Sequence, residues 1–135
     1  MKEIEIDAKI NNLEKVTSLI DEELLSVNCP PKVQAQIDVA IDELFSNIAN
    51  YAYEDSTEQT ITVRIDELSD TLKMTYIDSG YPYNPLEKQD PDITLAASER
   101  SIGGLGIFLV KKMTDNMTYY YEDGKNHLQI EKSIR

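Results

Sequence analysis

The sequence predicts an α+β fold in which helices cover one face of a single sheet. Strand-like alternation comes mostly in hairpin pairs, and the helical segments between them carry apolar residues along one side only. Such helices pack as one layer against a sheet formed by the strands. We therefore expect a two-layer sandwich with a mixed, mostly antiparallel sheet. At 135 residues the chain has the length of one domain, so residues 1–135 are expected to form a single unit.

The first part of the chain predicts one strand and two helices. Alternation over Lys2–Asp7 indicates a short strand. Asn11-Asn12 is suited to cap a first helix, which should stop near Ser26–Cys29 because Pro30-Pro31 cannot continue it. The second helix is expected from about Lys32 to Tyr53. Its apolar side consists of Ile37, Ala40, Ile41, Leu44, Phe45, Ile48 and Ala52.

A hairpin and an irregular segment follow. Thr60–Asp66 and Leu72–Asp78 both alternate cleanly, and the short polar link between them favours a hairpin. Residues 79–104 contain three prolines and no long periodic run, apart from one helical turn expected near 93–98. A segment of this length without regular structure is typical of a functional loop.

The last elements are a helix and a second hairpin. Leu105–Thr114 is expected to be a helix preceded by glycines. Asn116–Tyr121 and Asn126–Ile134 alternate on either side of Asp123-Gly124, a dipeptide typical of tight hairpin turns.

Composition excludes several classes of function. The net charge of −12 argues against nucleic acid as a partner, because phosphate backbones are bound by clustered Lys and Arg. No apolar run is long enough to span a membrane, and the first residues do not resemble a signal peptide. The single cysteine, Cys29, allows no internal disulfide, and a cytoplasmic location is expected. The single histidine, His127, is expected to be a half-exposed strand residue without a role.

Three motifs carry possible chemistry. Glu43 and Asn47 lie one helical turn apart, so a carboxylate and a carboxamide project side by side, as ligands of a hard cation do. Asp78-Ser79-Gly80 leaves a strand through a glycine turn. Gly103–Gly106 opens a helix whose free N–H groups would face an anion. Taken singly, these are a polar helix face, a polar turn and a flexible loop; together and in this order they describe a nucleotide site.

The ordered motifs resemble those of the GHKL ATPase superfamily. Residues 43–53 look like its N box, Asp78-Ser79-Gly80 like its G1 box, and Gly103-Gly104-Leu105-Gly106 like its G2 box. The small size and the form of residues 43–53 are most similar to bacterial anti-sigma factor serine/threonine kinases. The resemblance implies the histidine-kinase-like ATPase fold, also called the Bergerat fold. It departs from the family at Tyr51, where related sequences often have His, and at Tyr81–Pro85, where a second glycine is replaced by a proline-rich run.

The resemblance also implies roles for single residues. Glu43 would be the general base, and Asn47 would bind Mg²⁺ at the ATP phosphates. Asp78 would accept from the adenine amino group, with Gly80 making room for the ring. Residues 79–103 would form a lid over the nucleotide. The expected phosphate-binding residues are Gly103, Gly104, Leu105 and Gly106, with Arg100 as a further phosphate contact or else a solvated loop charge.

The leading hypothesis is accordingly an ATP-dependent serine/threonine kinase acting as an anti-sigma, partner-switching regulator. Its partners would be a sigma factor and a small antagonist protein that it phosphorylates, and it is expected to form a homodimer through its first strand and helix. The alternative is a non-catalytic ATP-binding module that switches a protein–protein surface. An ATPase domain of a histidine kinase and a plain α+β fold without nucleotide are weaker alternatives.

Overall fold

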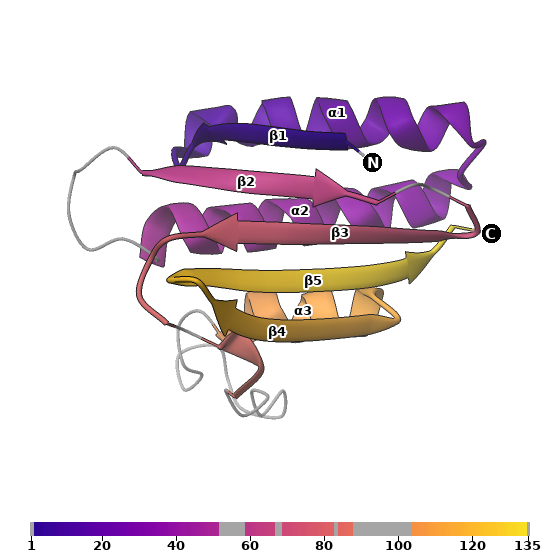
Figure 1. Ribbon diagram of the computed structural model, residues 1–135. Helices are drawn as coiled ribbons and strands as arrows, with labels where there is room; N and C mark the ends of the chain where they lie inside the picture. Colours follow the sequence, from indigo (N-terminus) through magenta and orange to yellow (C-terminus); the bar gives the residue numbers. More distant parts are fainter. Residues whose placement is uncertain (1, 52–58, 67–68, 83, 88–103, 135) are drawn as a thin grey trace.

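The computed structural model describes residues 2–51, 59–66, 69–82, 84–87 and 104–134 (Figure 1). The expected end of the second helix at 52–53, the link at 67–68 and residues 88–103 lie outside this part. The elements, in chain order, are β1 (Lys2–Asp7), η1 (Ile10–Asn12), α1 (Leu13–Ser26), α2 (Pro31–Tyr51), β2 (Thr60–Ile65), β3 (Thr71–Asp78), η2 (Pro85–Glu87), α3 (Gly104–Met113), β4 (Asn116–Glu122) and β5 (Lys125–Ser133).

The strands form one five-stranded sheet in the order β1-β2-β3-β5-β4. Every pairing between these strands is antiparallel, so the expected mixture contains no parallel pair in the described part of the chain. β3 is the central strand, and its last residue, Asp78, lies opposite Ile61 of β2 and Asn126 of β5. The fold therefore sets this carboxylate between two neighbouring strands.

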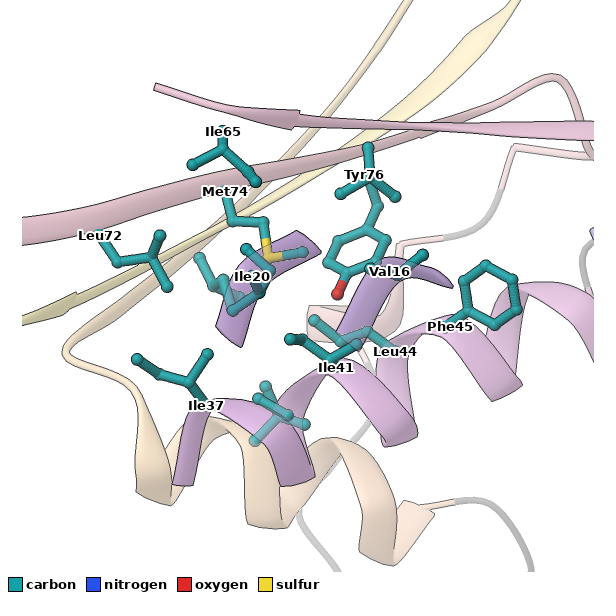
Figure 2. Close-up of a cluster of buried hydrophobic side chains, with 14 of the residues drawn as sticks. Val16, Ile20, Ile37, Ile41, Leu44, Phe45, Ile65, Leu72, Met74 and Tyr76 are labelled. Atoms are coloured by element: carbon teal, nitrogen blue, oxygen red, sulfur yellow. The ribbon is translucent and has the colours of Figure 1, made fainter. Parts of the chain in front are cut away.

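The α-helices α1, α2 and α3 form the second layer and lie on the same side of the sheet (Figure 1). The core fills the space between the layers, where Ile37, Ile41 and Leu44 of α2 point toward the sheet (Figure 2). The expected alternation holds over the first half of β3, where Leu72 and Met74 are fully buried in this core, whereas every residue from Met74 to Asp78 is buried because β3 lies at the centre of the sheet. The predicted two-layer α+β fold with helices on one face is confirmed.

The helix boundaries follow from local chemistry. α1 ends at Ser26, and Asn28 just beyond it has a φ of 57°, a conformation that asparagine tolerates. α2 begins at Pro31, in agreement with the expected start at about Lys32, because proline suits the first position of a helix. Asn12 is the N-cap residue of α1, as expected, but its side chain makes no capping hydrogen bond: the Asn12 amide donates to the Asp7 carbonyl oxygen at 2.9 Å and ties α1 to the end of β1.

The β4–β5 turn has the geometry that the sequence predicts. Asp123 and Gly124 have φ values of 55° and 74°. Two positive φ values at the centre of a two-residue loop match the twist of the flanking strands. The turn thereby sets the register in which Tyr119 faces Leu128 and Tyr121 faces Asn126. None of the helices in the described ranges is long and apolar enough to cross a membrane.

Candidate nucleotide site

α2 and α3 place a carboxylate against a glycine. Glu43 and Asn47 are both half-buried on α2, in its C-terminal half. A Cβ built on Gly106 of α3 would lie 2.3 Å from Glu43 Oε2 and 3.2 Å from its Cδ. A side chain larger than hydrogen would therefore displace this carboxylate. The first and third motifs of the sequence meet at this point.

The second motif forms a buried turn at the end of β3. Asp78 is only 6% exposed, and its Oδ1 accepts from the Gly80 N–H at 2.9 Å and from Asn126 Nδ2 at 3.0 Å. No described residue donates to the other carboxylate oxygen, Oδ2. Gly80 is itself buried. Among the described residues, the turn thus holds the Asp78 carboxylate by one oxygen and supplies no donor to the second.

Asn126 is a residue that the sequence reasoning missed. It is 6% exposed, and its Nδ2 approaches the Tyr81 carbonyl oxygen at 2.8 Å and the Gly80 carbonyl oxygen at 3.4 Å, in addition to Asp78. Its Oδ1 accepts a hydrogen bond from the Tyr119 hydroxyl. A usable signal existed, since Asn126 occupies an inward position that alternates with Leu128 and Ile130, where a polar residue needs a partner.

Burial and hydrogen bonding act in opposite directions on the ionisation of Asp78. Burial raises the pKa of the Asp78 carboxyl above its usual range, whereas the hydrogen bonds from Asn126 and Gly80 and the nearby His127 act in the opposite direction. His127 is a half-buried strand residue, as expected, and its ring stacks on Tyr120 with centroids 4.4 Å apart. A carboxylate held in this way suits a neutral N–H donor on a ligand.

The remaining predicted positions divide into two groups. Gly104 and Leu105 begin α3, where the first N–H groups of a helix have no partner within it. Arg100 and Gly103 lie outside the described residues. The C-terminal ends of α2 and β3 and the N-terminal end of α3 lie at the same end of the domain (Figure 1). The fold therefore gathers the three motifs at one end of the sheet.

The donor set at this end fits a nucleotide with a hard cation. No cluster of three or more His, Cys, Asp or Glu side chains suited to a metal occurs in the described ranges. Mg²⁺ commonly takes only one or two protein oxygens and completes its shell with phosphate and water. The oxygens of Glu43 and Asn47 on α2 and the glycine approach at Gly106 are compatible with that arrangement.

The fold and these motifs define a class of protein, and comparison with known proteins assigns it. The family described as the histidine kinase-like ATPase domain matches residues 6–132, and the chain belongs to this family. A solved structure with RsbU and RsbW domains from Mycobacterium tuberculosis shares the fold, with a TM-score of 0.64 at 15% identity over 99% of this chain and 33% of that chain.

Two curated relatives of this chain are named as protein kinases. The serine-protein kinase RsbW of Listeria monocytogenes is 29% identical over 90 residues, which are 64% of this chain and 57% of that protein. The serine/threonine-protein kinase BtrW of Bordetella bronchiseptica is 21% identical over 99 residues, which are 73% of this chain and 70% of that protein. The matched region thus spans 57% of the RsbW relative's length.

Proposed function

We propose that this protein is an ATP-dependent serine/threonine protein kinase that acts as an anti-sigma, partner-switching regulator. The observation that carries the proposal is the contact of the Glu43 carboxylate with the backbone of α3 at Gly106, where the phosphates would lie. The names of the relatives RsbW and BtrW support the same activity. The whole chain would act as a single ATP-binding unit in the cytoplasm.

In this proposal each motif has one task. Asp78 accepts from the adenine amino group beside Gly80, and the N–H groups of residues 103–106 hold phosphate oxygens, with Arg100 as a further contact. Asn47 would be the protein ligand of Mg²⁺. Bound there with ATP, the ion would neutralise charge on the phosphate oxygens.

Glu43 would remove the proton from the attacking hydroxyl. A serine or threonine hydroxyl of the partner forms a bond to the γ-phosphorus, and the bond from that phosphorus to the β–γ bridging oxygen breaks. The hydroxyl proton passes to Glu43, and ADP leaves. Because this chemistry depends mostly on position, the close packing of Glu43 on α3 is the feature that it needs.

The proposed partners are a sigma factor and a small antagonist protein that carries the target hydroxyl. A homodimer is also proposed. β1 lies at the edge of the sheet next to α1, and an edge strand leaves backbone groups available for pairing with a second chain.

The test is phosphoryl transfer from labelled ATP to antagonist-like proteins encoded beside this gene. We expect Mg²⁺-dependent labelling of a serine or threonine in the wild type. Glu43→Gln should lower the rate at least ~100-fold with little change in ATP affinity. ATP binding without transfer to any of these proteins would favour the non-catalytic module. Asn47→Ala should remove the part of ATP affinity that depends on Mg²⁺.

A further inference from the structure

We propose that Asn126 is a positioning residue: it holds oxygen Oδ1 of Asp78, so that Oδ2 is the oxygen that accepts a hydrogen bond from the nucleotide base. It also fixes the chain immediately after β3. The inference rests on the proposed ATP binding, but it does not depend on phosphoryl transfer.

The contacts of the Asn126 amide define its orientation. Its Oδ1 accepts a hydrogen bond from the Tyr119 hydroxyl. A hydroxyl can donate or accept, but the Gly80 and Tyr81 carbonyl oxygens only accept and an amide nitrogen only donates, so these carbonyls set Nδ2 on the Asp78 side and Oδ1 beside the Tyr119 hydroxyl. The acceptors that Nδ2 approaches among the described residues are Asp78 Oδ1 at 3.0 Å, the Tyr81 carbonyl oxygen at 2.8 Å and, more weakly, the Gly80 carbonyl oxygen at 3.4 Å.

The two oxygens of Asp78 have different surroundings. Oδ1 already accepts from Asn126 and from the Gly80 N–H. A carboxylate oxygen offers about two lone-pair directions, so Oδ1 is occupied. Oδ2 receives no donor from the described residues and is left to accept an N–H from a ligand. A 6-amino purine supplies that donor, whereas a 6-oxo purine presents an acceptor to the same oxygen.

Asn126 also holds the chain that follows β3. The Asn126 amide holds the carbonyl oxygens of Gly80 and Tyr81, although the Tyr81 side chain itself is 61% exposed. The same amide therefore determines both the rotation of the Asp78 carboxylate and the path of the backbone that leaves the strand. An acid at position 126 would keep the shape but replace the donor by a second carboxylate facing Asp78.

The experiment compares ATP and inosine triphosphate, which lacks the 6-amino group, binding to the wild type and to Asn126→Asp. We expect the wild type to prefer ATP at least ~10-fold. Asn126→Asp should weaken ATP binding ~10- to 100-fold at pH 8 and bring the preference close to one. Gln129→Glu makes the same amide-to-acid change on β5, at a side chain that donates to Thr75 instead, and it should keep the preference.

Two further variants, Tyr119→Phe and Asn126→Ala, distinguish loss of the amide donor from a general loss of nucleotide binding. Tyr119→Phe removes the hydroxyl that donates to the amide oxygen and so loosens the Asn126 side chain, which should reduce the preference ~3- to 10-fold. Asn126→Ala should lose the preference at every pH, whereas Asn126→Asp should regain ATP affinity below neutral pH, when the new carboxyl at position 126 takes a proton and can donate to Asp78 again. A folded Asn126→Asp that keeps the wild-type preference, or loses affinity equally for both nucleotides, would overturn the role of Asn126. Absence of transfer by the wild type would instead overturn the kinase proposal alone.

Discussion

The carboxylate of Glu43 occupies the place that a side chain at position 106 would need. A Cβ on Gly106 would approach Glu43 Oε2 to 2.3 Å, closer than such carbons come to other atoms in proteins. The glycine is thus required by the close approach of two helices, because Gly106 is helical and shows no positive φ. The glycine and the acid form one unit, although 63 positions separate them in the chain.

This contact predicts the result of Gly106→Ala. The methyl group would push the flexible Glu43 side chain aside, which costs little stability. Displacement of a general base by about 1 Å is expected to lower transfer ~100-fold. The measurement is the single-turnover rate of transfer at saturating ATP, together with ATP affinity, which should change less than the rate.

A double-mutant cycle isolates the contact. In the Glu43→Ala background the space beside position 106 is free, and alanine favours a helix over glycine by up to ~1 kcal/mol. Gly106→Ala should then raise the free energy of unfolding and leave the residual transfer rate unchanged. Equal effects of Gly106→Ala in both backgrounds would show that the two residues are not coupled.

Asp78 predicts a pH dependence of ATP binding. Its burial raises its pKa, and only the ionised form accepts an N–H at both oxygens. ATP affinity should therefore fall as pH decreases through a range higher than that of an exposed aspartate. Calorimetric titrations from pH 8 to pH 5 measure this, and Asp78→Asn should bind weakly with a shallower pH profile. Protonation of the nucleotide itself affects the wild type and Asp78→Asn equally, so it cancels when the two pH profiles are subtracted.

The raised pKa of Asp38 predicts that the free energy of unfolding falls as pH rises. Burial and the neighbouring carboxyl of Asp21 raise the pKa of Asp38 from 3.8 to about 7. Each of these side chains has a buried oxygen, Oδ1, without a hydrogen-bond partner among the described residues. Burial and, to a smaller extent, the charge of Asp38 raise the pKa of the Cys29 thiol. Between about pH 4 and pH 7 the folded state binds more protons than the unfolded state, so the stability contributed by the protonated form is lost as pH rises through this range.

Asp38→Asn should consequently raise the free energy of unfolding at pH 8 by about 1 kcal/mol, after allowance for solvent screening at this half-buried site. That corresponds to roughly 4 °C in Tm, with a smaller gain at pH 5. Asp42→Asn makes the same change on the exposed side of α2 and serves as the control. A gain at pH 5 as large as that at pH 8 would contradict the assignment.

Tyr76 predicts a stabilising mutation in the core. Its side chain is fully buried among residues of α1 and α2, and its hydroxyl makes no hydrogen bond within the described structure (Figure 2). Burial raises the pKa of Tyr76 well above its usual range, so the hydroxyl is neutral. Tyr76→Phe should increase the free energy of unfolding by about 1 kcal/mol, because it removes an unpaired polar group.

Urea denaturation measures this change. Tyr119→Phe is the matched control, since its hydroxyl donates to Asn126 and its loss should destabilise by about 1 kcal/mol. Opposite signs for the two tyrosines are the expected outcome. Destabilisation by Tyr76→Phe would mean that its hydroxyl is paired in solution.

Much of the fold could be predicted from local patterns. Alternation placed β2, β3 and β5 within one or two residues, and Asp123-Gly124 marked the final turn because its backbone conformation is a local property. The start of α2 and Asn12 as the N-cap residue of α1 were predicted, but the partner of the Asn12 side chain was not. That partner depends on which of several nearby groups the folded chain brings close, and the Asn12 amide donates to the Asp7 carbonyl oxygen.

The sequence by itself determined the layered fold and the order of three motifs, since periodicity and glycine positions are local. Only the tertiary structure decided which of these residues meet. Glu43 lies against Gly106 because α2 packs beside α3, and Asn126 lies against Asp78 because β5 pairs with β3. The sequence reasoning missed Asn126 for the same reason: the register of an antiparallel pair, set by contacts along both strands, selects the partner of a residue far away in the chain.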